Sequence, residues 1–241
     1  MDRHRLDNSR RYLDRIRIMK TIIISLGGSL IVPDKIDTNF LAKFRKLILR
    51  YHDKYRFVIY CGGGSTARKY QKALKKVIGN GTSAMDWMGI SATYLNAFLM
   101  RSVFGIYADP DIIENPTKKV NSKKKILIAC GWKPGWSTDY DAVLIAKTLK
   151  SGLVINMTNV DYLYDKDPKY KSAKPVKDTT YKEIKKIIGT RWTPGLNAPF
   201  DPVAIKAAEK LGIKVIISGK SIANLKNILD GKDFKGTLIS E

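Results

Sequence analysis

Short apolar runs alternate with helical patterns along most of this sequence. Five such runs, rich in β-branched residues, each end in a polar turn that leads toward a helical pattern; they cover residues 21–26, 56–61, 126–130, 153–157 and 214–218. Continuous apolar strands that alternate with helices are typical of a mostly parallel sheet covered by helices on both faces. We therefore predict an α/β fold, built as one domain over residues 19–241.

The helical patterns fill the stretches between these runs. They cover residues 37–51, 66–77, 83–103, 139–149, 180–188, 202–211 and 222–229. A further strand is expected at 236–240, and another at 105–108, ahead of a polar loop or hairpin at 109–125. In an open parallel sheet, the turns at the carboxyl ends of the strands meet in one crevice that binds the ligand. The turns that follow the strands are therefore the candidate functional segments.

Three of these turns are rich in glycine. Gly27-Gly28-Ser29 and Gly62-Gly63-Gly64-Ser65 each follow a strand, and a third turn runs from Gly131 to Asp139. Glycine lets the backbone approach a ligand closely, so that successive N–H groups can face an anion where a helix begins. The GxxxxGK[ST] and GxGxxG patterns are both absent from the sequence. Three such turns in one sheet favour a site for several phosphates over three unrelated tight turns.

The chain is strongly basic, with 44 Lys and Arg against 22 Asp and Glu and a net charge of +22. Such a surface attracts polyanions, so nucleic acid, nucleotides and anionic membranes all fit it, as does a general coat of solvated lysines. The lysine cluster at 118–125 has no interleaved aromatic residue on which single-stranded RNA would stack. No apolar run approaches the ~20 residues of a membrane span. The charge alone does not choose among these ligands, but a solvated loop explains the lysine cluster better than an RNA site, and we expect neither a membrane nor nucleic acid as a partner.

The two cysteines, Cys61 and Cys130, belong to no CxxC or Cys/His set, so we expect no metal site built from protein side chains. Residues 1–18 contain six Arg, three Asp and few core residues. They lack the apolar stretch of a signal peptide, and their acids argue against a transit peptide. We expect them to be an extension, disordered or upstream of the native start at Met19, with a basic amphipathic helix as the alternative. The protein is then expected in the cytoplasm.

Five stretches, at 24–29, 62–68, 86–101, 134–139 and 158–168, occur in the order found in a known family. They resemble the amino acid kinase family, and within it the archaeal enzymes that act on UMP. The first two resemble the family's phosphate turns. Pro134-Gly135-Trp136-Ser137-Thr138-Asp139 is similar to the archaeal Pro-Gly-His-Thr-Thr-Asp. Thr158-Asn159-Val160-Asp161, with Tyr164 and Asp167, resembles the loop that binds the donor nucleotide. The likeness extends over residues 20–240.

The resemblance implies a three-layer α/β/α sandwich and transfer of the γ-phosphoryl group of ATP to UMP with Mg²⁺, in a homo-oligomeric enzyme, a dimer or a hexamer. The catalytic residues it implies are Gly28, Ser29, Asp139 and Lys206. The residues implied to bind ATP are Gly28, Ser29, Gly64, Arg68, Thr158, Asn159, Tyr164 and Asp167. The residues implied to bind UMP are Gly63, Asp86, Trp132, Lys133, Pro134, Gly135, Trp136, Ser137 and Thr138.

These residue types fit the chemistry. In-line phosphoryl transfer needs positioning and positive charge rather than a base, because the acceptor is already a phosphate oxygen. Backbone amides at Gly28 and Gly64 would supply oriented donors, and Asp86 would accept hydrogen bonds from ribose hydroxyls. Ser25 stands where many bacterial members of the family carry lysine. Lys133, Lys206 or the metal ion would then have to supply that charge.

Each of these side chains also has a plainer interpretation. Asp86 and Asp139 would serve as helix N-caps. The others would be solvated on helices or packed at the edge of the core, namely Arg68, Trp132, Trp136, Tyr164 and Lys206. Other functions also stay open: phosphorylation of a carboxylate, carbamate or isopentenyl phosphate within the same family, a non-catalytic nucleotide- or oxyanion-binding protein, and an RNA-binding protein. The segment around Asp86 favours a ribonucleotide acceptor.

Overall fold

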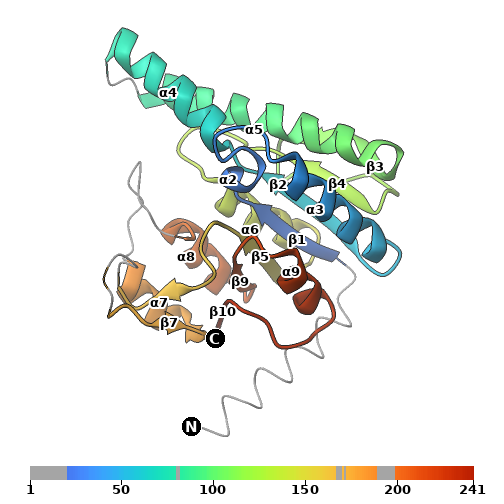
Figure 1. Cartoon of the computed structure of the whole chain (residues 1–241), viewed down its shortest axis with the longest axis vertical. Helices are drawn as coiled ribbons and strands as arrows, with labels where there is room; N and C mark the ends of the chain where they lie inside the picture. Colours follow the sequence, from blue (N-terminus) through green and yellow to red (C-terminus); the bar gives the residue numbers. More distant parts are fainter. Residues whose placement is uncertain (1–20, 80–81, 167–169, 171, 189–198) are drawn as a thin grey trace, which may run out of the picture.

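The fold is organised around a mostly parallel sheet. The computed structural model describes residues 21–79, 82–166, 170, 172–188 and 199–241, so the extension at 1–18 lies outside the described residues. Within this part of the chain the sheet has eight strands in the order β3-β4-β2-β1-β5-β9-β10-β8 (Figure 1). Its strands are β1 (Thr21–Leu26), β2 (Arg56–Cys61), β3 (Ala108–Ile113), β4 (Ile126–Ala129), β5 (Leu153–Met157), β8 (Asp178–Thr180), β9 (Lys214–Ser218) and β10 (Thr237–Ser240). A separate ribbon pairs β6 (Leu163–Tyr164) with β7 (Pro175–Val176).

Strand β1 lies where the strand order reverses. It pairs in parallel with β2 on one side and with β5 on the other. The described pairs from β3 across to β9 are all parallel, whereas β10 runs antiparallel to β9. In open parallel sheets, ligands bind outside the carboxyl ends of the strands at such a reversal. The topology therefore places the turn after β1 at the centre of the expected crevice.

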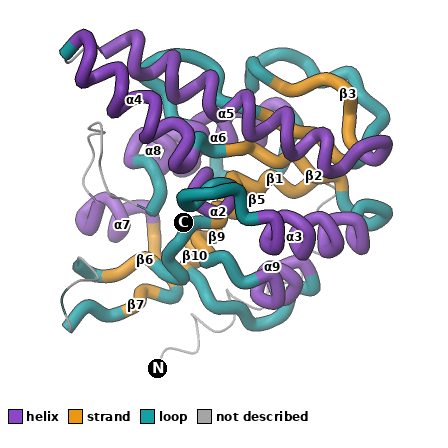
Figure 2. The backbone as a smooth tube through the Cα atoms, turned by 45° about the horizontal axis from the view of Figure 1, so that its top comes forward, coloured by secondary structure: helices purple, strands orange, loops and turns teal. Residues whose placement is uncertain are grey.

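Helices cover both faces of the sheet. They are α2 (Gly28–Ile31), α3 (Thr38–Tyr51), α4 (Gly64–Ile78), α5 (Thr82–Phe104), α6 (Thr138–Thr148), α7 (Tyr181–Ile188), α8 (Pro202–Lys210) and α9 (Ile222–Leu229). Helices α3, α5 and α9 bury side chains in one core, and α6, α7 and α8 in the other. Helix α4 lies alongside α5 at the edge of the molecule (Figure 2). None of the described helices is both long and apolar enough to cross a membrane.

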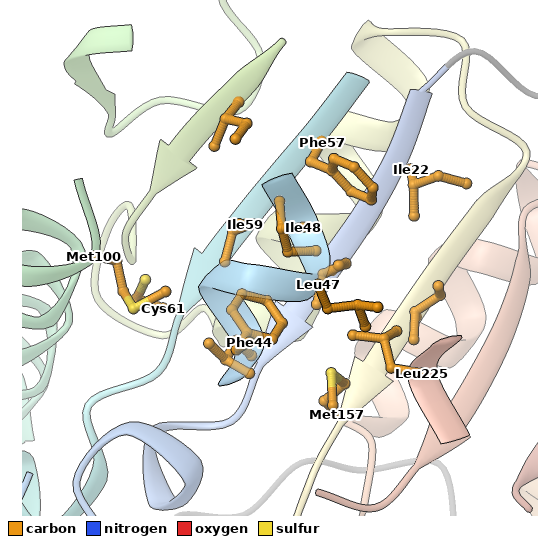
Figure 3. Packing of buried hydrophobic residues seen from close by; sticks show 14 of the residues in the cluster. Ile22, Phe44, Leu47, Ile48, Phe57, Ile59, Cys61, Met100, Met157 and Leu225 are labelled. Atoms are coloured by element: carbon orange, nitrogen blue, oxygen red, sulfur yellow. The ribbon is translucent and has the colours of Figure 1, made fainter. Parts of the chain in front are cut away.

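Helix α3 illustrates how local sequence sets this packing. The Asp37 side chain caps the helix by accepting a hydrogen bond from the Phe40 amide at 2.9 Å. The apolar residues that follow recur at helical spacing and therefore share one face. Phe44 and Ile48 on that face belong to the same core cluster as Phe57 of β2, and all three side chains are fully buried (Figure 3). Burying each such side chain stabilises the fold by roughly 1.5–3 kcal/mol.

The prediction of an α/β fold with a mostly parallel sheet is confirmed. The prediction of a strand at 105–108 is wrong, because Gly105–Tyr107 is a 3₁₀ turn and β3 begins only at Ala108. Strand β3 thus occupies the first part of residues 109–125, for which the sequence predicts a loop or hairpin. Strand β3 lies at the edge of the sheet and pairs only with β4 among the described strands, so it tolerates Pro110 and polar residues that hide it in the sequence.

Candidate active site

The glycine turns after β1 and β2 fit into each other through backbone alone. A Cβ atom added to Gly28 would lie 2.0 Å from the amide nitrogen of Gly64 and 2.5 Å from the carbonyl carbon of Gly62. Gly64 has a φ of +62°, and a Cβ added there would lie 2.4 Å from the carbonyl oxygen of Gly28. These separations are too short for any side chain. Glycine is therefore required at these positions by the contact between the two turns.

Helix α4 begins inside this contact. Since Gly64 is its first residue, the amides of its first turn have no carbonyl partner within the helix. One of them, on Ser65, donates to the Val32 carbonyl at 2.8 Å. The amide of Gly62 donates to Leu26 at 2.9 Å, which ties the second turn to the end of β1. The start of a helix of this length carries partial positive charge, so an anion is favoured beside it.

The ends of β5 and β9 continue the row formed by these turns. The Gly27 amide donates to the Met157 carbonyl at 2.8 Å, and the Thr158 amide donates to the Ser218 carbonyl at 2.9 Å. Thr158 and Asn159, which are hydrogen-bonded to each other at 3.2 Å, therefore lie beside the first glycine turn. The carboxyl ends of four neighbouring parallel strands thus meet along one edge, as the sequence predicts.

Asp139 connects this row to the helices on the opposite face of the sheet. Its Oδ1 accepts a hydrogen bond from the Ser25 hydroxyl at 2.8 Å, and its Oδ2 accepts one from the Asp201 amide at 3.3 Å. Asp201 caps α8 and also accepts from the Ser137 hydroxyl. The pKa of Asp139 is raised to about 6 in total. Burial is the largest cause, the Ser25 hydrogen bond opposes it, and the charge of Asp201 adds to the rise. Asp139 therefore fixes α6 and α8 against the end of β1.

The loop between β4 and α6, residues 131–137, is held by side chains rather than by backbone. We call it the β4–α6 loop. Three of its amides donate to side chains on neighbouring helices: Gly131 to Thr93 Oγ1 at 2.8 Å, Trp132 to Asp141 Oδ2 at 3.0 Å, and Gly135 to Asp86 Oδ2 at 2.9 Å. Helices α5 and α6 therefore set the path of this loop.

A half-buried aromatic cluster with a lysine at its centre joins the β4–α6 loop to the first turn of α6. The ring centroids of Trp132 and Trp136 are 5.1 Å apart, and Trp136 lies 4.4 Å from Tyr140. The Lys133 Nζ lies 4.2 Å from the centroid of Trp132 and 4.3 Å from that of Trp136. Each cation–π contact of this kind is worth about 0.5–2 kcal/mol. The loop therefore offers flat π surfaces and a positive charge to an incoming ligand.

Two predicted acids are not the helix N-caps of the plainer interpretation. Ser137 caps α6 instead, by accepting a hydrogen bond from the Tyr140 amide at 3.2 Å, and Thr138 is the first residue of that helix. Asp86 lies within α5, where its carboxylate accepts a hydrogen bond from the β4–α6 loop. Both acids therefore hold other segments in place instead of closing their own helices.

Other predicted residues are not brought into these contacts. Arg68 is exposed on α4 and donates to the Pro33 carbonyl at 3.2 Å. Lys206 is exposed on α8 and makes no hydrogen bond or ion pair with the described part of the chain. Tyr164 is half-buried in β6, outside the main sheet, and Asp167 lies outside the described residues. Ser29 and Gly63 lie in the two interlocked turns, and Pro134 lies in the β4–α6 loop.

Three residues that organise the site are not among the predicted catalytic and binding residues. Asn96 donates to the Gly62 carbonyl at 2.7 Å, and Asp141 and Asp201 hold the two ends of the β4–α6 loop. Asp141 leaves one signal in the sequence. It stands four residues before Ile145, on the face of α6 that the apolar pattern buries. An acid at such a position is uncommon unless it has a specific partner.

The site contains acids but no assembled metal cage. Among the described residues, no three His, Cys, Asp or Glu side chains are grouped so that they could hold a metal ion. The oxygens of a nucleotide triphosphate are the ligands that Mg²⁺ usually shares with a protein. A divalent cation would therefore fit this site as part of its nucleotide.

Backbone turns that present amides at the carboxyl edge of a parallel sheet define a class of α/β proteins that bind phosphorylated ligands. Within this class, residues 20–219 match the family model described as the Amino acid kinase family. The chain belongs to that family, and the resemblance predicted from its turns is confirmed.

Relatives of known name extend this assignment over most of the chain. The uridylate kinase of Thermoplasma volcanium is 37% identical over 226 residues, which are 92% of this chain and 98% of the relative. The uridylate kinase of Methanospirillum hungatei is 33% identical over 227 residues, 92% of this chain and 95% of the relative. The crystal structure of uridylate kinase from Archaeoglobus fulgidus superposes with a TM-score of 0.79 at 28% identity, covering 91% of this chain and 99% of that one.

Proposed function

We propose that this protein is a UMP kinase, which transfers the γ-phosphoryl group of ATP to UMP and yields UDP and ADP. The observation that carries the proposal is the interlock of Gly28 with Gly64. It brings the two glycine turns to one point, and in-line transfer between two bound nucleotides requires such a convergence of phosphate sites. The matches to uridylate kinases over about nine-tenths of the chain support UMP as the acceptor.

The protein's part in the reaction is positioning and charge. A phosphate oxygen of UMP forms a bond to the γ-phosphorus as the bond from that phosphorus to the β,γ-bridging oxygen breaks, so no base is needed. Amides of Gly28, Ser29 and Gly64 would orient the transferring group at little reorganisation cost. Asp139 would keep Ser25 and α8 in place beside it. Mg²⁺, bound with the ATP phosphates, would neutralise part of their charge.

The β4–α6 loop would hold the acceptor. Asp86 already accepts from the Gly135 amide through Oδ2, and its other oxygen would accept from the ribose hydroxyls of UMP. Trp132 and Trp136 would present their ring faces to the uracil base, and Gly63 would lie at the acceptor phosphate. Ser137 and Thr138, at the start of α6, would complete the loop around the nucleotide.

The donor would lie across β1, at the ends of β5 and β9. Thr158 and Asn159 are in place beside the first glycine turn, and Tyr164 with Asp167 would close over the adenosine. Arg68 and Lys206 are exposed on helix surfaces, so each would have to turn toward the ATP phosphates once they are bound. The net charge of +22 would favour the approach of both anionic nucleotides.

We also propose a homo-oligomer, a dimer or a hexamer, of one domain over residues 19–241, in the cytoplasm where both nucleotides are available. Helix α5 supports self-association, because Trp87, Tyr94, Leu95 and Phe98 along it are between 42% and 59% exposed. Contiguous exposed apolar side chains of this kind usually mark an interface. Light scattering with size-exclusion chromatography measures the mass directly, and a monomer at micromolar concentration would contradict the proposal.

The test of the function is ADP formation from Mg-ATP with a panel of acceptors: UMP, CMP, AMP, GMP, acetylglutamate, carbamate and isopentenyl phosphate. We expect turnover with UMP and weaker turnover with CMP. Turnover confined to a carboxylate, carbamate or isopentenyl phosphate would assign another activity of the family. Binding of ATP without turnover of any acceptor would indicate a non-catalytic nucleotide-binding protein.

A further inference from the structure

Asp141 is a fully buried acid with an unsatisfied oxygen. Its side chain has 0% exposure and lies in the first turn of α6. One carboxylate oxygen, Oδ2, accepts from the Trp132 amide at 3.0 Å, whereas Oδ1 has no hydrogen-bond partner among the described residues. Leaving a buried polar atom without a partner costs roughly 1–3 kcal/mol. The contribution of Asp141 to folding therefore does not explain why an acid stands there.

The surroundings of Asp141 make its burial more costly still. The hydroxyl of Tyr60, on β2, is also buried without a partner among the described residues; burial raises the pKa of that hydroxyl well above its usual value, and the charge of Asp141 adds to the rise. The pKa of Asp141 itself is raised to about 7 in total. Burial is the largest cause and the charge of Asp139 adds to it, whereas the Trp132 amide and Lys133 both lower the pKa. The stabilising partners of Asp141 therefore both belong to the β4–α6 loop.

The hydrogen bond from Trp132 is the point at which α6 controls this loop. The amide of the preceding residue, Gly131, is already held by Thr93 of α5. The Asp141 bond then fixes the next peptide and with it the direction in which the Trp132 ring leaves the backbone. Because Trp136 and Lys133 pack on that ring, the whole aromatic cluster depends on this peptide. Without this hydrogen bond, neither the loop backbone nor the Trp136 and Lys133 side chains would be fixed in one arrangement.

We propose that Asp141 is a positioning residue for the acceptor: through the Trp132 amide it holds the β4–α6 loop in the arrangement that binds UMP, without touching either nucleotide. The inference rests on the proposed function for the identity of the acceptor. The part of the proposal that concerns structure, namely that Asp141 orders residues 131–137, can be tested without any enzymatic activity. The proposal also accounts for the unfavourable burial of Asp141, because a charge buried without an ion-pair partner destabilises the fold and is retained only where it has another task.

The first experiment measures the loop without substrate. Amide hydrogen exchange is compared in peptides that cover residues 131–137 for the full-length protein and for Asp141→Ala, Asp141→Asn and Ser151→Ala. Asparagine can still accept from the Trp132 amide through its oxygen. Ser151 is the matched control, since it is buried and hydrogen-bonded to the Thr21 carbonyl at the opposite end of β1. We expect exchange in these peptides to rise at least tenfold in Asp141→Ala and to stay within threefold of wild type in the other two.

The second experiment measures whether the loss of Asp141 affects the KM for UMP, the KM for ATP or kcat. In Asp141→Ala we expect the KM for UMP to rise about tenfold or more, while the KM for ATP and kcat stay within twofold of wild type. Asp141→Asn should restore the KM for UMP. If the alanine variant does not fold, Asp141→Val serves in its place, because it fills the volume and removes the acceptor.

Several outcomes would overturn the proposal. Unchanged exchange in the loop of Asp141→Ala would show that the Trp132 bond does not order it. Equal losses for UMP and ATP, shared by Ser151→Ala, would assign Asp141 a merely structural role. Absence of UMP turnover in the wild type would instead refute the proposed function, and the exchange experiment would then still decide whether Asp141 holds the loop.

Discussion

The two halves of the site are built in opposite ways. The turns after β1 and β2 are fixed by backbone-to-backbone contact, with no room for a side chain between Gly28 and Gly64. The β4–α6 loop is fixed by side chains of Thr93, Asp141 and Asp86, and nothing lies within 4 Å of a Cβ atom added to Gly135. The first half suits a task common to every phosphoryl transfer. The second half can be remodelled, which suits the choice of acceptor.

The most severe test of this comparison replaces one glycine by alanine in each half of the site. Gly28→Ala should destabilise the protein by about 3 kcal/mol or more and abolish turnover, because the new methyl group meets backbone that cannot move aside. Gly135→Ala, at φ +80° in open space, should cost only about 1–2 kcal/mol. Thermal unfolding and the ADP assay measure both variants. Similar losses for the two would remove the distinction between the halves.

Removing the carboxylate at Asp86 should affect only the acceptor side. Asp86→Ala loses a hydrogen bond to a loop amide and, under the proposed function, the contact with ribose. Hydrogen bonds to charged groups contribute roughly 1.5–3 kcal/mol, so the KM for UMP should rise about 10- to 100-fold while the KM for ATP is unchanged. Asp53→Ala, at an exposed acid beside His52, is the control and should behave as wild type. An equal rise in both KM values would contradict the assignment of Asp86 to the acceptor.

Stability against pH should report on the side-chain contacts, because Asp139 and Asp141 both make such contacts and burial raises the pKa of both. The pKa of Asp139 is raised to about 6 and that of Asp141 to about 7, from ordinary values of 3.8. Between about pH 4 and pH 7 the folded protein thus holds more protons than the unfolded chain, so stability falls as pH rises through this window. Asp141→Asn should unfold a few degrees above wild type at pH 8 and level with it at pH 4. A constant difference across that range would show that Asp141 keeps an ordinary pKa.

The smallest effect is expected for the lysine in the aromatic cluster. Lys133→Met removes two cation–π contacts but leaves a thioether that packs favourably on aromatic rings, so the net cost should be less than about 1 kcal/mol of stability. Tryptophan fluorescence should nevertheless change, since Lys133 lies over the rings of both Trp132 and Trp136. Lys54→Met, which removes a cation from the ring of Tyr55, is the matched control and should leave that fluorescence unchanged. Identical spectra for the two variants would place Lys133 away from the tryptophans.

The difference between the halves also explains what the sequence could predict. Backbone contact leaves glycines in the sequence, and because glycine has few other reasons to recur after strands, both glycine turns could be identified as candidate functional segments. The strands and most helices were predictable for a similar reason, since their apolar spacing follows directly from burial. The interlock itself was not predictable, because it depends on a separation between two turns that are distant in the chain.

Side-chain contacts leave weaker traces. The resemblance to a family predicted that Asp86 and Asp139 belong to the site, whereas their position in the sequence alone suggested N-caps. Asp141 was missed because an acid in the first turn of a helix is ordinary, and only its place on the buried face of α6 is unusual. Arg68 and Lys206 point to solvent, so their predicted contacts with phosphate stay predictions.

The interlocked turns have a consequence for how such a protein can diverge. With no space between Gly28 and Gly64, neither turn can accept a substitution unless the other retreats at the same time, and single mutations offer no path between the two states. Variation is therefore channelled into the β4–α6 loop, where aromatic and charged residues can be exchanged one at a time. On this fold the two glycine turns should therefore change together or not at all, whereas the residues of the loop can change independently of one another.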